Sequence, residues 1–158
     1  MLLFNVSLKV IICYRLQRYL SKRKRFKCGI LQLLLGHWQV SRGNCQISPK
    51  AVIGKRLKLQ HPIGVVIGQG CTIGNDVSLW QNVTLGNDGR DVGYPCLEDN
   101  VRIFAGSMVI GNVVVGASAT VGAMSLVTSD IPPDSVAYGI PARVKAIGYK
   151  EKAKLGDE

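Results

Sequence analysis

The stretch LEDNVRIFAGSMVIGNVVVGASATVGAMSLVT (97–128) has an aliphatic residue at every sixth position, and this period decides the fold. The same step runs through two earlier segments, 47–59 and 67–85, and a small residue often follows the aliphatic one. The aliphatic positions are Ile47, Ile53, Leu59, Ile67, Ile73, Leu79, Leu85, Leu97, Ile103, Val109, Val115, Val121 and Val127. A period of six matches neither a helical turn nor the alternation of a long strand, so each unit is predicted to be a short strand and a corner.

Repeated units of strand and corner predict stacked coils. In such a stack the aliphatic side chain points inward and lies about 4.8 Å from its equivalent, while the small residue lets the backbone turn without a clash. A β-sandwich with accidental spacing is the alternative, but six successive aliphatic residues in one register over 97–127 argue against it. The chain is therefore predicted to be mainly β, with one parallel β-helix domain built from hexapeptide repeats.

Two interruptions of the repeat locate segments outside the scaffold. The step from Leu59 to Ile67 is eight residues, so the segment QHPIGVV (60–66) contains a two-residue insertion. The segment GNDGRDVGYPC (86–96) places Asp91 where an inward aliphatic residue belongs, so it is predicted to leave the stack as a loop. Loops on a rigid solenoid commonly carry binding and catalytic residues, which makes both interruptions candidates for the functional site.

The two ends of the chain differ from the repeat region. Residues 1–36 are predicted to form a basic, helical N-terminal segment, followed by the β-helix over 37–148 and a charged tail over 149–158. The formal net charge is +10, and the first acidic residue is Asp76, so the positive excess belongs to the N-terminal half. A dense basic run consists of Lys22, Arg23, Lys24, Arg25 and Lys27. Such a block fits anionic lipid, an acidic polymer, nucleic acid or a solvated face, and charge alone does not choose among them.

Cysteine usage and hydropathy bear on the compartment. The five cysteines, at positions 13, 28, 45, 71 and 96, include no CxxC pair and predict a reduced, cytoplasmic chain. The apolar opening is interrupted by Lys9, Arg15 and Arg18, so neither a membrane-spanning helix nor a signal peptide is expected. Two roles stay open for the N-terminal helix: docking on the inner face of a membrane, near a lipid-linked sugar, or capping the β-helix.

Two long segments carry a resemblance to known enzymes. HPIGVVIGQGCTIGNDVSLWQNVTLG (61–86) and YPCLEDNVRIFAGSMVIGNVVVGASATVGAMSLVTSDIPPDSVAYGIPARV (94–144) closely resemble the catalytic region of serine acetyltransferases and of relatives that acetylate capsule, exopolysaccharide or O-antigen sugars. The resemblance covers about residues 45–148. It implies a left-handed β-helix, a homotrimer and acetyl-CoA bound in a groove between subunits. The left hand follows from the resemblance alone, and it departs from the usual right-handed crossover rule.

Departures from the serine-specific pattern bear on the acceptor. The serine enzymes carry Asp-His where this chain has Gln60 and His61, and Arg-His-Pro where it has Gly93, Tyr94 and Pro95, so the clamp for an amino-acid carboxylate is missing. A short basic segment also stands in place of their large acidic helical domain. The resemblance is therefore closest to the sugar O-acetyltransferases of surface polysaccharide biosynthesis. Serine O-acetylation is the alternative, and a non-catalytic scaffold is a more distant one. The expected partners are acetyl-CoA and a saccharide or lipid-linked saccharide, and no nucleic acid.

His61 is the predicted catalytic residue. Acetyl transfer to an alcohol needs a general base, because a hydroxyl is a poor nucleophile until its proton is removed. His61 lies in the two-residue insertion, is the only histidine of the repeat region, and matches the family's catalytic histidine. Position 60 holds Gln60 rather than an acid, so a backbone carbonyl or another side chain must fix the imidazole tautomer.

Further residues are assigned to binding. Backbone amides around Gly86 and Asn87 are expected to stabilise the oxyanion. The acceptor candidates are Gln60, Asn82, Asn87, Asp88 and Tyr94, each of which also fits a plain corner or loop position. The family pattern implies acetyl-CoA contacts at Gly86, Ala105, Gly106, Ala123, Pro141, Ala142, Arg143 and Lys145. Small side chains there would admit the pantetheine amides, and the two cations would meet phosphates.

Two other chemistries are less favoured. A β-helical carbonic anhydrase needs three histidines around a metal, and this chain has only His37 and His61, so no metal is expected. An acyl intermediate on Cys71 or Cys96 is the second alternative. Cys71 occupies a small-residue position of the repeat, which favours packing over catalysis.

Overall fold

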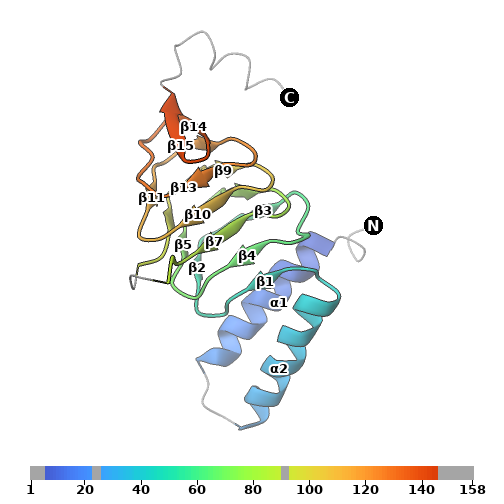
Figure 1. The fold of residues 1–158 in the computed structure, drawn as a ribbon. Helices are drawn as coiled ribbons and strands as arrows, with labels where there is room; N and C mark the ends of the chain where they lie inside the picture. The colour runs from blue at the N-terminus through green and yellow to red at the C-terminus, as the bar shows by residue number, and fades with distance from the viewer. Residues whose placement is uncertain (1–5, 23–25, 90–92, 146–158) are drawn as a thin grey trace.

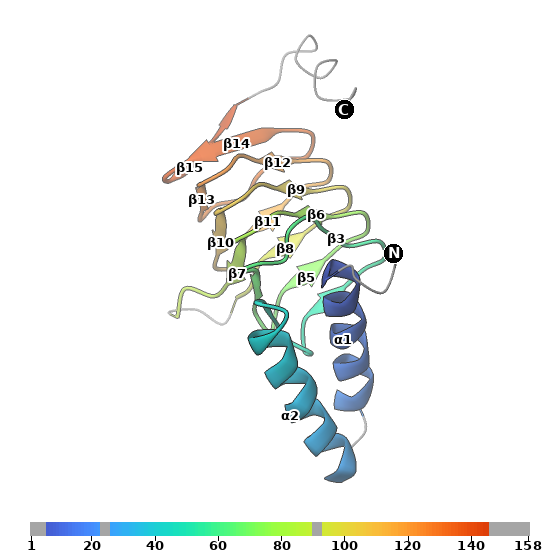
Figure 2. The same cartoon turned by 90° about the vertical axis from the view of Figure 1, so that its right-hand side faces the viewer.

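The chain forms a three-sided parallel β-helix with two helices at its N-terminal end (Figures 1 and 2). The computed structural model describes residues 6–22, 26–89 and 93–145. The basic residues 23–25, Asp91 and the charged tail over 149–158 lie outside these ranges. The predicted fold class, a mainly β parallel β-helix with a short helical segment before it, is confirmed.

Each side of the solenoid is one sheet of very short strands. The five-stranded sheet consists of β1 (Gln46–Ile47), β4 (Val66–Ile67), β7 (Thr84–Gly86), β10 (Met108–Ile110) and β13 (Leu126–Val127). The four-stranded sheet consists of β2 (Val52–Ile53), β5 (Thr72–Ile73), β8 (Cys96–Leu97) and β11 (Val114–Val115). The six-stranded sheet consists of β3 (Lys58–Leu59), β6 (Ser78–Leu79), β9 (Arg102–Ile103), β12 (Thr120–Val121), β14 (Val136–Gly139) and the antiparallel β15 (Ala142–Lys145).

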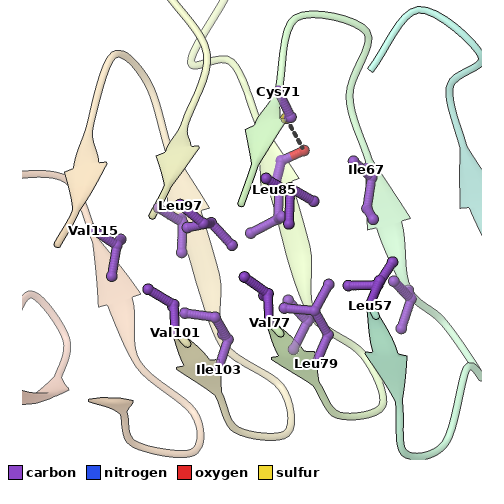
Figure 3. Packing of buried hydrophobic residues seen from close by; sticks show 14 of the residues in the cluster. Leu57, Ile67, Cys71, Val77, Leu79, Leu85, Leu97, Val101, Ile103 and Val115 are labelled. Atoms are coloured by element: carbon purple, nitrogen blue, oxygen red, sulfur yellow. Dashed lines mark hydrogen bonds between the residues drawn. The ribbon is translucent and has the colours of Figure 1, made fainter. Parts of the chain in front are cut away.

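The core is a stack of aliphatic side chains from all three sheets (Figure 3). Every position of the six-residue repeat identified in the sequence is buried, with exposed fractions of 5% or less. The residue two positions before each strand's inward residue is often buried as well, as at Ala51, Val77, Val101 and Ser107. Burying a Val, Leu or Ile side chain stabilises a fold by roughly 1.5–3 kcal/mol, so this column holds the coils together.

The corners are built from residues in the left-handed backbone region. One column has Asn44, Gly64, Asn82, Gly106 and Met124, with φ between 49° and 71°, and a second has Arg56, Asp76, Asn100, Ser118 and Asp134, with φ between 54° and 61°. A Cβ on Gly64 would lie 2.1 Å from Asn82 Oδ1, so that corner requires glycine. Equivalent corners thus repeat one conformation from coil to coil.

Both predicted interruptions lie where the repeat placed them. Register in the five-stranded sheet pairs Val66 with Thr84, eighteen residues on, whereas Gln46 pairs with Val66, twenty residues on. The first coil therefore contains two extra residues. Between Gly86 and Cys96 the chain leaves the sheets and returns with Leu97 in register with Ile73, which confirms a loop there.

The helical segment is longer than the sequence indicated. Helix α1 spans Val6–Ser21 and α2 spans Phe26–Ser41, so helix continues past the expected boundary at residue 36. Gly36, at the expected boundary, lies inside α2, where a Cβ would make only ordinary contact with Gln17. The helix ends instead where the amides of Arg42 and Gly43 both donate to the Trp38 carbonyl.

Helix α1 covers the open end of the first coil. Tyr14 is buried, and its hydroxyl donates to the Ala51 carbonyl at 2.8 Å. Arg15 Nη1 donates to the Ile53 carbonyl at 2.8 Å, and Arg18 Nη1 also donates to Ala51. These bonds occupy carbonyl groups of β2 and the turn before it, which would otherwise face water at the edge of the sheet. Neither helix, in the described part of the chain, is long and apolar enough to cross a membrane.

Candidate functional site

His61 projects from a bulge in the first coil. Lys58 pairs with Ser78 twenty residues on, but Val66 pairs with Thr84 only eighteen residues on, so the register shifts by two residues between them. The Gln60 amide still donates to the Leu79 carbonyl, and the Asn82 amide donates to the Ile63 carbonyl, so the shift falls between residues 60 and 63. The two extra residues are therefore His61 and Pro62. Pro62 is buried and anchors the bulge, whereas His61 is exposed. An accessible imidazole on a fixed turn is suited to meet a substrate.

The predicted acetyl-CoA residues of small size lie on the same corner as His61. We call this corner the site edge: it follows β3, β6, β9 and β12, where the chain passes from the six-stranded to the five-stranded sheet. Ala105 and Gly106 follow β9, and Ala123 follows β12. Coils lie about 4.8 Å apart, so Ala105 is roughly 10 Å and Ala123 roughly 14 Å along the axis from the coil of His61.

The site edge ends at the C-terminal hairpin. Strands β14 and β15 pair antiparallel, with Gly139 opposite Ala142 and Tyr138 opposite Arg143. The turn that contains Pro141 lies above Ala123 on the same edge, since β14 follows β12 in the sheet. Arg143 and Lys145 are exposed on the outermost strand. The structure thus brings the small residues and the Pro141 turn into one line above His61, with Arg143 beside the turn and Lys145 opposite Val136 at the other end of β14.

Gln60 and Asn82 share the site edge with His61. Gln60 precedes the bulge and is exposed, and its amide donates to the Leu79 carbonyl. Asn82 is exposed at the next corner, and its positive φ of 56° is that of a corner residue. Both side chains are accessible from the same side as His61.

The remaining predicted residues lie on a different corner. Gly86 ends β7, and Asn87 and Asp88 follow it where the chain passes to the four-stranded sheet, so the width of a short strand separates them from the site edge. That width is about 10 Å for three residues. Asn87 Nδ2 donates to the Gly93 carbonyl at 3.1 Å and closes the base of the loop. Within one chain, the predicted oxyanion amides are not beside His61.

Tyr94 packs on the scaffold. A Cβ on Gly70 would lie 2.2 Å from Tyr94 Cδ2, and a Cβ on Gly68 would lie 2.9 Å from Tyr94 Cε1. The ring therefore lies directly over this glycine turn and packs against the core. The contact gives Tyr94 a structural role, which is one of the two roles that the sequence left open for it.

Sequence reasoning missed an aromatic pair on the site edge. Trp80 and Phe104 immediately follow β6 and β9, and their rings stack with centroids 4.3 Å apart and an interplanar angle of 17°. Next to them, Gln81 Oε1 is buried and has no hydrogen-bond partner among the residues that the structure describes. The signal was available, because small residues commonly occupy the position after the inward aliphatic residue, and here two aromatic ones do.

The cysteine alternative is disfavoured by burial. Cys71 is fully buried, and its thiol donates to the Leu85 carbonyl oxygen at a distance of 3.4 Å. The dashed line in Figure 3 marks this contact. Desolvation raises the pKa of its thiol from 9.0 to about 11. Burial likewise raises the pKa of Cys96, with help from nearby Glu98. Since the thiolate is the nucleophile, neither site favours an acyl intermediate.

Comparison with known proteins gives close relatives. A serine acetyltransferase of Bacillus licheniformis is 41% identical to this chain, over 87% of this chain and 63% of that protein. The structure of the Neisseria gonorrhoeae serine acetyltransferase matches with a TM-score of 0.86 and 31% identity, over 99% of this chain and 60% of that one. A serine acetyltransferase structure in complex with CoA matches with a TM-score of 0.82 and 35% identity, over 91% and 59%. No family model matches the chain.

These matches support placing the chain among the hexapeptide-repeat acetyltransferases. They also support the left hand implied by the resemblance, because a solenoid of opposite hand would not superpose along its length. The relatives are named serine acetyltransferases, so the comparisons do not support the expected placement in the sugar-acetylating branch. The chain spans less than two thirds of the length of the relatives it matches. Within the described residues, no three His, Cys, Asp or Glu side chains gather to hold a metal ion.

Proposed function

We propose that this chain is an acetyl-CoA-dependent O-acetyltransferase with His61 as general base. One observation carries the proposal: an exposed histidine on an anchored bulge lies in line with Ala105, Gly106 and Ala123 and with the cationic hairpin. A cosubstrate along this edge would have its thioester near His61 and its phosphates near Arg143 and Lys145. The similarity to a serine acetyltransferase solved with CoA supports this cosubstrate.

The chemistry assigns one proton transfer to each half of the reaction. His61 removes the proton of the acceptor hydroxyl as its oxygen attacks the thioester carbonyl carbon. When the tetrahedral intermediate collapses, the carbon–sulfur bond breaks and the imidazolium returns its proton to the departing CoA sulfur. The products are the acetyl ester and free CoA. The backbone amides of Gly86 and Asn87 are the proposed oxyanion donors.

A homotrimer is proposed because the two parts of the proposed site, His61 and the loop after β7, lie on different corners of one chain. The loop that begins at Gly86 lies on a different corner from His61, so it would have to reach the imidazole from a neighbouring copy. A closed cyclic arrangement would bring the loop corner of one subunit to the site edge of the next. Light scattering should give three chains per particle, and a fully active monomer at assay concentration would refute this arrangement.

Two acceptors are proposed for the same reaction. The names of the relatives make L-serine the first candidate. A saccharide is the second, because Gln60 and Gly93 replace residues of the serine-specific pattern and Tyr94 packs over the turn at Gly70. Assays of free CoA release with L-serine and with saccharides would decide between them.

The catalytic proposal is tested by comparing two histidine variants. His61→Ala should reduce turnover by roughly 10²–10⁴, the usual effect of losing a general base, without changing assembly or melting temperature. His37→Ala is the matched control, because His37 is also exposed but lies in α2, outside the β-helix. Near-normal turnover by the His61 variant would refute the assignment.

The contacts of α1 with the first coil favour the capping role for the two N-terminal helices. Tyr14, Arg15 and Arg18 all donate to the first coil. Peripheral binding to an anionic membrane is the second candidate, since α2 exposes Leu33 and Leu34 to 76% and 62% next to a basic stretch without acids. Sedimentation with anionic vesicles should then be salt-sensitive and weakened by replacing both leucines with serine. Absence of any sedimentation would leave the cap as the sole role.

A further inference from the structure

Trp80 and Phe104 form a stacked aromatic pair on the site edge, outside the buried core. They follow the inward residues Leu79 and Ile103, so they point out of the coil at the site edge, and neither belongs to the buried core. Both residues are partly exposed. An outward aromatic pair on a surface corner adds little to core packing, which raises the question of what it contacts.

The stacking geometry turns one face of the Trp80 indole toward the first coil, which carries His61. Trp80 is on the second coil and Phe104 on the third, and the rings stack with a 4.3 Å separation close to the spacing of the coils. Phe104 therefore covers the face of the indole that is turned to the C-terminal coils. The other face is turned to the first coil, where Gln60 holds the position equivalent to Trp80 and His61 follows it.

We propose that this indole face is a stacking platform for the sugar ring of a saccharide acceptor, which presents a hydroxyl to His61. The inference rests on the proposed acetyl transfer and selects the acceptor class. One face of a pyranose ring is lined by C–H groups, whose slight positive charge is attracted to the negative face of an aromatic ring. L-Serine has no such extended face, so a platform of this size would contribute nothing to its binding.

The position of the pair argues against contact with the adenine of acetyl-CoA. The cations proposed for its phosphates, Arg143 and Lys145, are on the β14–β15 hairpin, and β14 lies three strands beyond β6 in the sheet. Three coil steps amount to roughly 14 Å. Trp80 is therefore at the acetyl end of the edge, one coil from His61.

Fluorescence provides a binding test that is independent of catalysis. The chain has two tryptophans, and Trp38→Phe leaves Trp80 as the sole indole reporter. The probes are methyl hexopyranosides, N-acetylhexosamines, L-serine and CoA, each titrated into the Trp38→Phe protein. The proposal expects a saturable change in Trp80 emission with at least one saccharide and none with L-serine. No response to any saccharide, or a response to CoA alone, would overturn it.

Kinetics separate this inference from the proposed function. Trp80→Leu should raise the KM for the saccharide by about fivefold or more, the scale of losing one aromatic stacking contact, while the KM for acetyl-CoA stays constant. Trp80→Tyr should recover most of the affinity, and Trp38→Phe should match the wild type. An unchanged KM for the saccharide in Trp80→Leu would refute the platform while leaving the acetyltransferase proposal intact. Turnover on L-serine with none on saccharides would have the same two consequences. Failure of His61→Ala to lose activity would instead refute the proposed function.

Discussion

Replacing Tyr14 tests whether α1 holds the first coil in place. The side chain is 1% exposed, its ring packs in the main core, and its hydroxyl donates to the Ala51 carbonyl at 2.8 Å. Tyr14→Phe removes only the hydrogen bond, and Ala51 keeps its bond from Arg18, so the expected loss of unfolding free energy is about 1 kcal/mol. Tyr14→Ala also removes the ring, and a loss of roughly 3–5 kcal/mol is expected.

The measurement is urea unfolding at one fixed protein concentration, because assembly makes stability depend on concentration. The matched control is Ile12→Ala on the opposite face of α1, where the side chain is 56% exposed and the expected change is within about 0.5 kcal/mol. In melting temperature, the Tyr14→Ala loss corresponds to a fall of roughly 6–20 °C. If Tyr14→Ala unfolds at the same urea concentration as Ile12→Ala, then α1 does not stabilise the solenoid.

Three further outcomes follow from the geometry. Cys71 should resist thiol reagents in the folded protein at pH 8. Because burial raises the pKa of its thiol from 9.0 to about 11, the neutral thiol's contribution to stability should be complete below pH 9 and lost as the pH rises through 11. Urea unfolding at each pH measures this loss. Gly70→Ala should destabilise the fold, since the new Cβ would lie 2.2 Å from Tyr94 Cδ2, and Tyr94→Ala in the same chain should relieve the clash in thermal melts. Replacing Arg143 and Lys145 by alanine should raise the KM for acetyl-CoA with little change in kcat, whereas an unchanged KM would exclude a phosphate contact.

The periodic part of the fold could be read from the sequence because each coil repeats one physical constraint. A six-residue period with an aliphatic residue in phase leaves little choice for what faces inward, and every predicted inward position is buried. The insertion at His61 was visible for the same reason, since a strict period makes two extra residues obvious. The end of α2 was not predictable from Gly36, because the space around that glycine depends on how α1 packs beside it.

The site was less predictable because it depends on which corners are neighbours in space. A period of six does not say how far the corner after Leu85 lies from the corner after Leu59, so Gly86 and Asn87 could not be separated from His61 in sequence alone. The contact of Tyr94 with the turn at Gly70 could not be predicted either, because the two are distant in the chain. Trp80 and Phe104 were detectable as exceptions to the small-residue position, but their stacking required the coil order.

The fixed spacing of the coils sets the length of the site edge. From the coil of His61 to the turn at Pro141 there are four strand steps, from β3 to β14, which amount to roughly 19 Å. A solenoid lengthens or shortens only by whole coils, so this span can change only in jumps of about 4.8 Å. An acyl donor in which the distance from thioester to phosphates is shorter or longer than the site edge cannot be accommodated by small side-chain changes. The number of coils itself therefore selects the length of the donor, independently of any residue that touches it.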